Sequence, residues 1–121
     1  MAIPEYADGF LLVEVPLGDG ILDMKWIVDT VARARPNTRF TLEMMTRSPL
    51  KIPCLTGRYW VTFDGINGRN LARTLAMVRA NPPRRPLPDV GALSPEARLQ
   101  LEIDNAVKCI VCSRDRLGLA A

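Results

Sequence analysis

The sequence contains no histidine, only three cysteines, and few aromatic residues, which make up 6% of the chain. Histidine is the side chain most often used for acid–base catalysis near neutral pH, and it is the commonest metal ligand. Its absence excludes Ser-His-Asp, Cys-His and histidine-ligated zinc chemistry carried by this chain alone. The odd number of cysteines provides no disulfide framework, which favours a reducing, cytoplasmic location.

Long apolar runs and a strong net charge are also missing. No stretch approaches the roughly 18 apolar residues that would indicate a membrane span, and residues 1–8 carry acids without the pattern of an export signal. We therefore expect no membrane partner. The net charge of +3 is mild, and no cluster of aromatic and basic residues is evident, so we expect no nucleic-acid partner either.

The hydrophobic pattern predicts an α/β fold. Phe10–Val15 is almost continuously apolar, as in a parallel strand covered on both faces, and Arg39–Met44 is a short second strand. Between them, Asp23–Arg35 has a capping residue, an apolar face and a following proline, which together predict a helix. Glu14 and Glu43 lie 29 positions apart, which matches the roughly 30-residue repeat of a strand–helix–strand unit.

The character of the sequence changes after Met45. Two prolines and no sustained period predict a long loop over 46–55, with Tyr59, Trp60 and Phe63 packed against it. A second helix is expected from about Arg69 to Ala80.

The last part of the chain is a proline-rich connector followed by a helix. Ser94-Pro95-Glu96 is a strong helix start, with a cap, a proline at the first helical position and an acid in the first turn. One face of this helix is apolar and comprises Leu99, Ile103, Ala106, Val107 and Ile110. The single domain 1–121 therefore divides into a lead-in (1–9), a βαβα unit (10–80), the connector (81–93) and the C-terminal helix (94–118).

Glu43 is the most interesting candidate for chemistry. It lies at the carboxyl end of a predicted strand, which is where barrels and open α/β sheets build their active sites. A carboxylate there can bind a divalent metal or act as a base. The structural alternative is a Glu at the end of a strand that pairs with a nearby cation such as Arg47. Glu14 is similarly placed, but Pro16 follows it directly, which favours a structural role.

Two short motifs carry little weight. Gly18-Asp19-Gly20 could bring backbone N–H groups to a phosphate, but it lacks the spacing of known fingerprints and is more typical of a tight turn. Cys109 and Cys112 form a C-x-x-C motif, but they lie deep inside a predicted helix, which favours packing over redox chemistry.

Positive charge is concentrated in two places. Arg47, Lys51 and Arg58 lie in or near the long loop after Glu43, where an anionic substrate could bind. Arg84 and Arg85 in the connector are more typical of a solvated surface.

Several motifs together resemble one known family. They are the run Leu42-Glu43-Met44-Met45-Thr46-Arg47-Ser48-Pro49-Leu50-Lys51-Ile52-Pro53-Cys54-Leu55, then Tyr59-Trp60, and the earlier Glu14-Val15-Pro16-Leu17-Gly18-Asp19-Gly20 followed by Asp23. The chain is similar, from about Glu5 to Leu119, to the C-terminal part of the sugar phosphate isomerase/epimerase family, the xylose-isomerase-like TIM barrels.

The resemblance implies a partial (β/α)₈ barrel, namely the last two βα units plus a C-terminal helical extension. Glu43 would match the last carboxylate ligand of the family's divalent metal (Mn, Mg or Zn), which polarises substrate oxygens during proton transfer. Arg47 would lie at the mouth of the barrel near a small sugar or sugar phosphate. The implied chemistry is isomerisation or epimerisation.

The chain departs from the family in what it lacks. Family members supply a Glu, an Asp and His ligands from earlier strands, and none of these strands is present here. At 121 residues, the chain has about half the ~250 residues of a complete barrel. We therefore expect a segment that is inactive alone and that pairs with a second copy or with the missing barrel half, because unpaired strand edges promote association. The competing hypothesis is a non-enzymatic α/β binding or self-assembly module.

Overall fold

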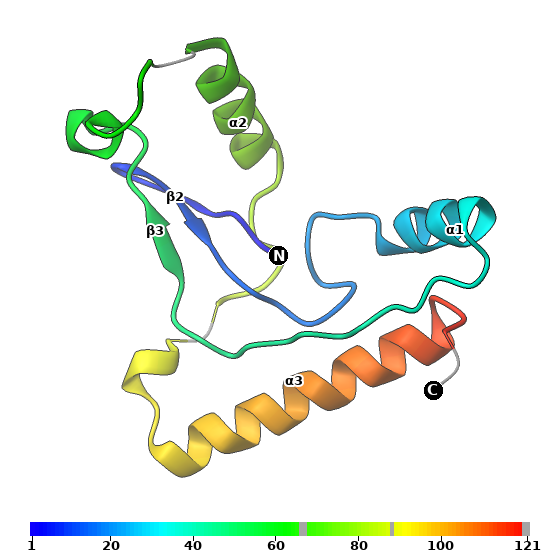
Figure 1. The fold of residues 1–121 in the computed structure, drawn as a ribbon. Coiled ribbons are helices and arrows are strands. Elements are labelled where there is room, and N and C mark those ends of the chain that lie inside the picture. The colour runs from blue at the N-terminus through cyan, green and yellow to red at the C-terminus, as the bar shows by residue number, and fades with distance from the viewer. Residues whose placement is uncertain (66–67, 88, 120–121) are drawn as a thin grey trace.

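A small antiparallel sheet forms the first part of the structure (Figure 1). The structure is a computed structural model, and it describes residues 1–65, 68–87 and 89–119. The strands are β1 (Glu5–Tyr6), β2 (Gly9–Leu12) and β3 (Leu50–Ile52), in the order β1-β2-β3. The fold is therefore mixed α/β, as the sequence predicts, but these strands are antiparallel.

The β1–β2 hairpin is closed by a tight turn in which Tyr6 pairs with Gly9. Gly9 has a φ of +154°, and a Cβ atom there would lie 2.1 Å from the Ile52 carbonyl oxygen on β3. Only glycine allows the two strands to approach this closely. The pairing continues beyond the strands as a bridge between Ala2 and Val13, whose backbones exchange hydrogen bonds of 2.8 and 3.0 Å.

Three helices follow where the sequence predicts them, namely α1 (Met24–Ala34), α2 (Gly68–Ala80) and α3 (Pro95–Asp115). Asp23 caps α1 by accepting a hydrogen bond of 2.9 Å from the backbone N–H of Trp26. Ser94 caps α3 by accepting one of 3.2 Å from the backbone N–H of Ala97. These caps satisfy backbone donors that a helix start leaves without partners. Two short 3₁₀ turns, η1 (Gly57–Trp60) and η2 (Val90–Ala92), complete the fold.

The main core lies between the sheet and α2. Its buried members are Ile3, Phe10, Cys54, Leu75 and Val78. An aromatic cluster of Tyr59, Trp60 and Phe63 lies beside this core, with ring centroids 5.0 to 5.6 Å apart. The Trp60 Nε1–H donates a 2.9 Å hydrogen bond to the Cys54 carbonyl oxygen. The predicted packing of these rings near the 46–55 segment is thus confirmed for Trp60.

The strand predictions differ from the structure in two places. Arg39–Met44 forms no strand, and the segment 46–55, predicted as a loop, contains β3. The reason is that β2 already has a partner on each edge. It pairs with β3 (Leu50–Ile52) on one side and with β1 on the other. With both edges of β2 occupied, no position remains beside it for 39–44. This segment crosses from α1 toward β3 as an extended chain (Figure 1).

Helix α3 packs against the loops with only one side. Asn105, Cys109 and Cys112 are buried on that side. The predicted apolar face points elsewhere, and its four large side chains are exposed to solvent, namely Leu99, Ile103, Val107 and Ile110.

The connector predicted over 81–93 includes Pro88, which lies outside the described residues. Among the described residues, none of the helices has the length and apolar character needed to cross a membrane.

Candidate functional site

Glu43 and Arg47 lie in the extended segment that precedes β3. The Glu43 side chain is exposed, and within the described residues it has neither an ion pair nor a hydrogen bond. The structural alternative, in which Glu43 pairs with Arg47, is therefore not the arrangement that forms.

Arg47 is instead held by Glu14. Its guanidinium donates to Glu14 Oε1 at 2.6 Å, while Glu14 Oε2 accepts a hydrogen bond of 3.1 Å from the Met45 backbone N–H. The structural role favoured for Glu14 is thus consistent with its contacts. The Glu14 carboxylate thus connects the end of the predicted strand Phe10–Val15 to the residues that follow the predicted strand Arg39–Met44.

The described residues do not by themselves fit a divalent metal. Over 1–65, 68–87 and 89–119, no three His, Cys, Asp or Glu side chains gather closely enough to hold an ion. Divalent ions of this kind need several oxygen or nitrogen ligands. Glu43 could supply one such ligand, and the remaining ligands would have to come from outside these residues.

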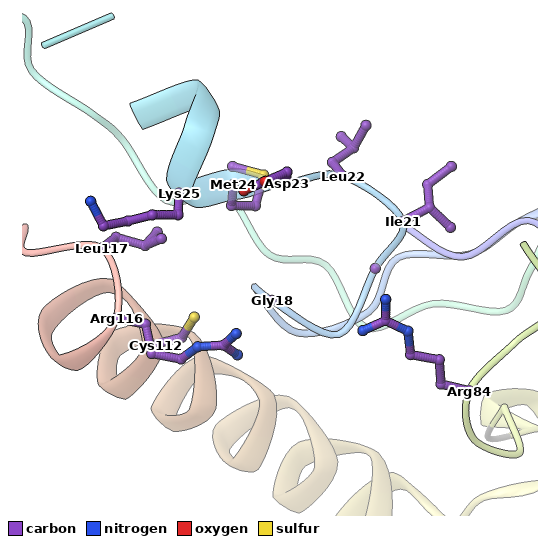
Figure 2. Close-up of a pocket in the computed structure, with 11 residues that line it drawn as sticks. Gly18, Ile21, Leu22, Asp23, Met24, Lys25, Arg84, Cys112, Arg116 and Leu117 are labelled. Carbon is purple, nitrogen blue, oxygen red and sulfur yellow. The ribbon is translucent and has the colours of Figure 1, made fainter. Parts of the chain in front are cut away.

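Two adjoining cavities lie between the loop after β2, the proline-rich connector and α3. The larger has a volume of about 580 Å³ and is bordered by Glu14, so it begins beside the Glu14–Arg47 pair. The smaller, of about 400 Å³, is shown in Figure 2. The two cavities share Gly18, Arg84 and Arg116.

The larger cavity is electropositive. Both of its acids are already engaged, Glu14 by Arg47 at 2.6 Å and Asp19 by Arg85 at 3.9 Å. Three further cations line it, namely Arg84, Lys108 and Arg116. Among the described residues, these three form no ion pair. Cations without acidic partners around a concave surface attract small anions such as phosphate, and arginine binds phosphate with two parallel hydrogen bonds.

Gly18 lines both cavities. Its φ is +89°, and a Cβ atom there would lie 2.9 Å from Arg116 Nη1 and 3.0 Å from Cys112 Sγ. Figure 2 shows Arg116 extending from α3 toward this turn, while Arg84 reaches it from the connector. Gly18 thus serves close packing in a tight turn, in agreement with the ordinary interpretation of the Gly-Asp-Gly motif.

The N-terminal amine lies near the same loop. Burial lowers the pKa of the Met1 amino group below its usual value of 8.0, and the nearby negative charge of Glu14 partly opposes this shift. The Met1 carbonyl oxygen accepts a 3.0 Å hydrogen bond from the Ile21 backbone N–H, which fixes the end of the loop.

The cysteines of the C-x-x-C motif pack as the sequence predicts. Cys109 and Cys112 are free and buried, and Cys109 Sγ accepts a hydrogen bond of 3.2 Å from the Leu17 backbone N–H. They join α3 to the loop that borders the cavities.

Sequence reasoning missed the electropositive cavity. Arg84 and Arg85 are exposed, as predicted, but they also line a concave surface with Lys108 and Arg116. Their proximity depends on how the connector folds back on α3, and no local spacing encodes that.

Comparison of the sequence with protein-family models, with curated proteins and with solved structures finds no match.

Proposed function

We propose that this chain is the C-terminal segment of a divalent-metal-dependent sugar (phosphate) isomerase/epimerase-like protein, catalytically inactive by itself. The observation that carries the proposal is the extended segment 39–49, whose first part, Arg39–Met44, has the sequence of a strand and pairs with no other strand in the described structure. The resemblance of 14–60 to the xylose-isomerase-like family gives this segment its proposed role.

The segment 39–49 has apolar side chains without a core to cover them. Phe40, Leu42 and Met45 are 39%, 43% and 54% exposed. Within the described structure, no backbone N–H from 39 to 44 donates to another backbone group. An alternating apolar strand with free edges is a site for pairing with further strands. Strands from the rest of a barrel would supply both the hydrogen bonds and the apolar cover.

The proposed metal ligand is Glu43, and the proposed substrate contact is Arg47. Completed by a Glu, an Asp and His side chains from earlier strands, Glu43 would become one ligand of a divalent metal. The metal would polarise the oxygens of a bound sugar. Arg47, oriented by Glu14 at 2.6 Å, would present a fixed positive charge to the substrate.

The electropositive cavity favours a phosphorylated sugar over a neutral one. Arg84, Lys108 and Arg116 surround a volume of about 580 Å³, which is within the usual range of small-molecule sites. Apolar groups of Val15, Leu87 and Leu101 complete its walls, as in many sites that bind the carbon skeleton of a ligand.

The codons upstream of Met1 provide the first test. We expect them to encode, in frame, further strand–helix units with the missing Glu, Asp and His ligands. A stop codon in that frame directly before Met1, with no such units, would contradict the proposal.

The second test is a calorimetric titration of Mn²⁺ into the protein that the complete frame encodes. We expect Glu43→Gln to weaken binding at least about tenfold, since each ligand of a multidentate site contributes strongly. Glu96→Gln, an exposed carboxylate on α3, is the matched control and should leave the affinity unchanged. Equal affinities for all three proteins would overturn the role of Glu43.

The alternative, a non-enzymatic self-assembly module, is favoured by one separate observation. The apolar face of α3 is exposed, although such faces normally lie in a core or at an interface. This surface does not depend on the isomerase proposal.

A further inference from the structure

The exposed side of α3 carries a continuous apolar stripe. Its members are Leu99 (63% exposed), Ile103 (47%), Val107 (53%), Ile110 (51%) and Val111 (42%). Leu99, Ile103, Ala106 and Ile110 follow the 4-3-4 spacing of a coiled-coil seam. The stripe runs for about 18 Å along the helix at 1.5 Å per residue.

The opposite side of α3 is already occupied. Asn105 Nδ2 donates a 2.9 Å hydrogen bond to Thr46 Oγ1, and the Glu102 carboxylate accepts one of 2.8 Å from the Thr46 backbone N–H. These contacts fix the rotation of the helix about its axis. The stripe therefore faces outward because of specific bonds on the inner side.

Charge is distributed unevenly along α3. The half before Asn105 contains three acids and one base, and the half after it contains two bases and one acid. On a helical wheel, Glu96 near the start and Arg114 near the end share one angular position, which lies between those of Ile103 and Val107 and so in line with the stripe. A surface of this kind is complementary to its own copy turned end for end.

We propose that α3 pairs with α3 of a second copy, antiparallel, about a two-fold axis at the level of Asn105. Such an isologous contact places Ile103 against Val107 of the partner and Leu99 against Val111 of the partner. It also places Glu96 of each copy opposite Arg114 of the other, at both ends of the seam. Ala106 near the centre provides the small side chain that lets two helices approach closely.

The partner is a second copy because three pairs of residues are each centred on Asn105, namely Leu99 and Val111, Ile103 and Val107, and Glu96 and Arg114. A different protein would need no such symmetry in this chain. The contact uses the outer side of α3 and no residue of the predicted strand 39–44, so its failure would leave the proposed isomerase role untouched.

Sedimentation velocity on the 121-residue chain tests the proposal. We expect a reversible dimer at micromolar concentration. Ile103→Asp should raise the dissociation constant at least about tenfold, because it buries a charge in the seam. The matched control is Val61→Asp, at a residue that is 78% exposed and distant in sequence, and it should leave the dissociation constant unchanged. A wild-type chain that stays monomeric up to about 100 µM would overturn the proposal.

A charge swap tests the antiparallel register. Glu96→Arg alone and Arg114→Glu alone each place like charges together at both ends of the dimer. We expect each to weaken association about tenfold or more. The double variant restores opposite charges and should recover most of the wild-type affinity. Circular dichroism checks that each variant keeps its helix content. If the double variant associates no better than either single variant, the antiparallel pairing is wrong.

Discussion

The two regions of this molecule are held together by different physics. Around the sheet and α2, apolar side chains meet in a closed core, where Ile3 and Val78 are 1% and 2% exposed. Around α3, the helix is attached by two buried thiols, Cys109 and Cys112, and by polar contacts of Glu102 and Asn105 with Thr46. Its large apolar side chains remain in solvent. The first region therefore has a closed apolar core, whereas the second leaves large apolar side chains exposed.

The largest expected loss of stability comes from a substitution in the core of the first region. Val78→Ala removes two methyl groups from the core between α2 and the sheet and should lower the free energy of unfolding by about 2 kcal/mol. Val61→Ala makes the same chemical change at a residue that is 78% exposed, and it should change stability by less than about 0.5 kcal/mol. Urea denaturation of both variants measures the difference. Equal shifts would mean that the sheet region has no closed core.

An intermediate effect concerns the junction between the regions. Glu14→Ala removes the carboxylate that holds both Arg47 and the Met45 backbone N–H. We expect a loss of about 1 kcal/mol, since the pair is partly exposed and screened by solvent. Limited proteolysis should then cut more rapidly between α1 and β3.

Lys25→Ala is the control substitution for Glu14→Ala. It removes the exposed pair that Lys25 forms with Asp29 within α1 and should cost only about 0.3 to 0.5 kcal/mol. If the two substitutions have the same effect on stability and on proteolysis, Glu14 has no special role in joining the regions.

The smallest effect is a pH dependence at the start of α3. Hydrogen bonds from the Glu96 backbone N–H and from the Ser94 side chain lower the pKa of Glu96 below its ordinary value of 4.5. Since the folded pKa is the lower one, this stabilisation is present above about pH 4.5 and is lost as the pH falls through the folded value. The Tm of wild type should exceed that of Glu96→Gln at about pH 7, and the difference should shrink as the pH falls below about 4.5. A difference that persists unchanged in acid would contradict this assignment.

Helices were predictable here because their signals are local. Asp23 and Ser94 mark the starts of α1 and α3 in the sequence itself, and both accept the expected capping hydrogen bonds. Gly118, with a φ of +68°, follows the end of α3 in the left-handed conformation that favours glycine.

Strands were less predictable because pairing is non-local. Leu50–Ile52 lies between Pro49 and Pro53, a context typical of a loop, but it pairs with β2 from about 40 positions away. Arg39–Met44 has the better strand pattern and no partner in the sheet. Similarly, sequence position alone placed Arg47 near Glu43, whereas the fold brings it to Glu14.

The three free thiols are distributed between the two regions, with Cys54 in the sheet core and Cys109 and Cys112 beneath the Gly18 turn. Each thiol is buried and reacts with an alkylating reagent only when its surroundings open. The chain therefore carries its own reporters, because the labelling rate of Cys54 measures breathing of the sheet core, and that of Cys109 or Cys112 measures the lifting of α3.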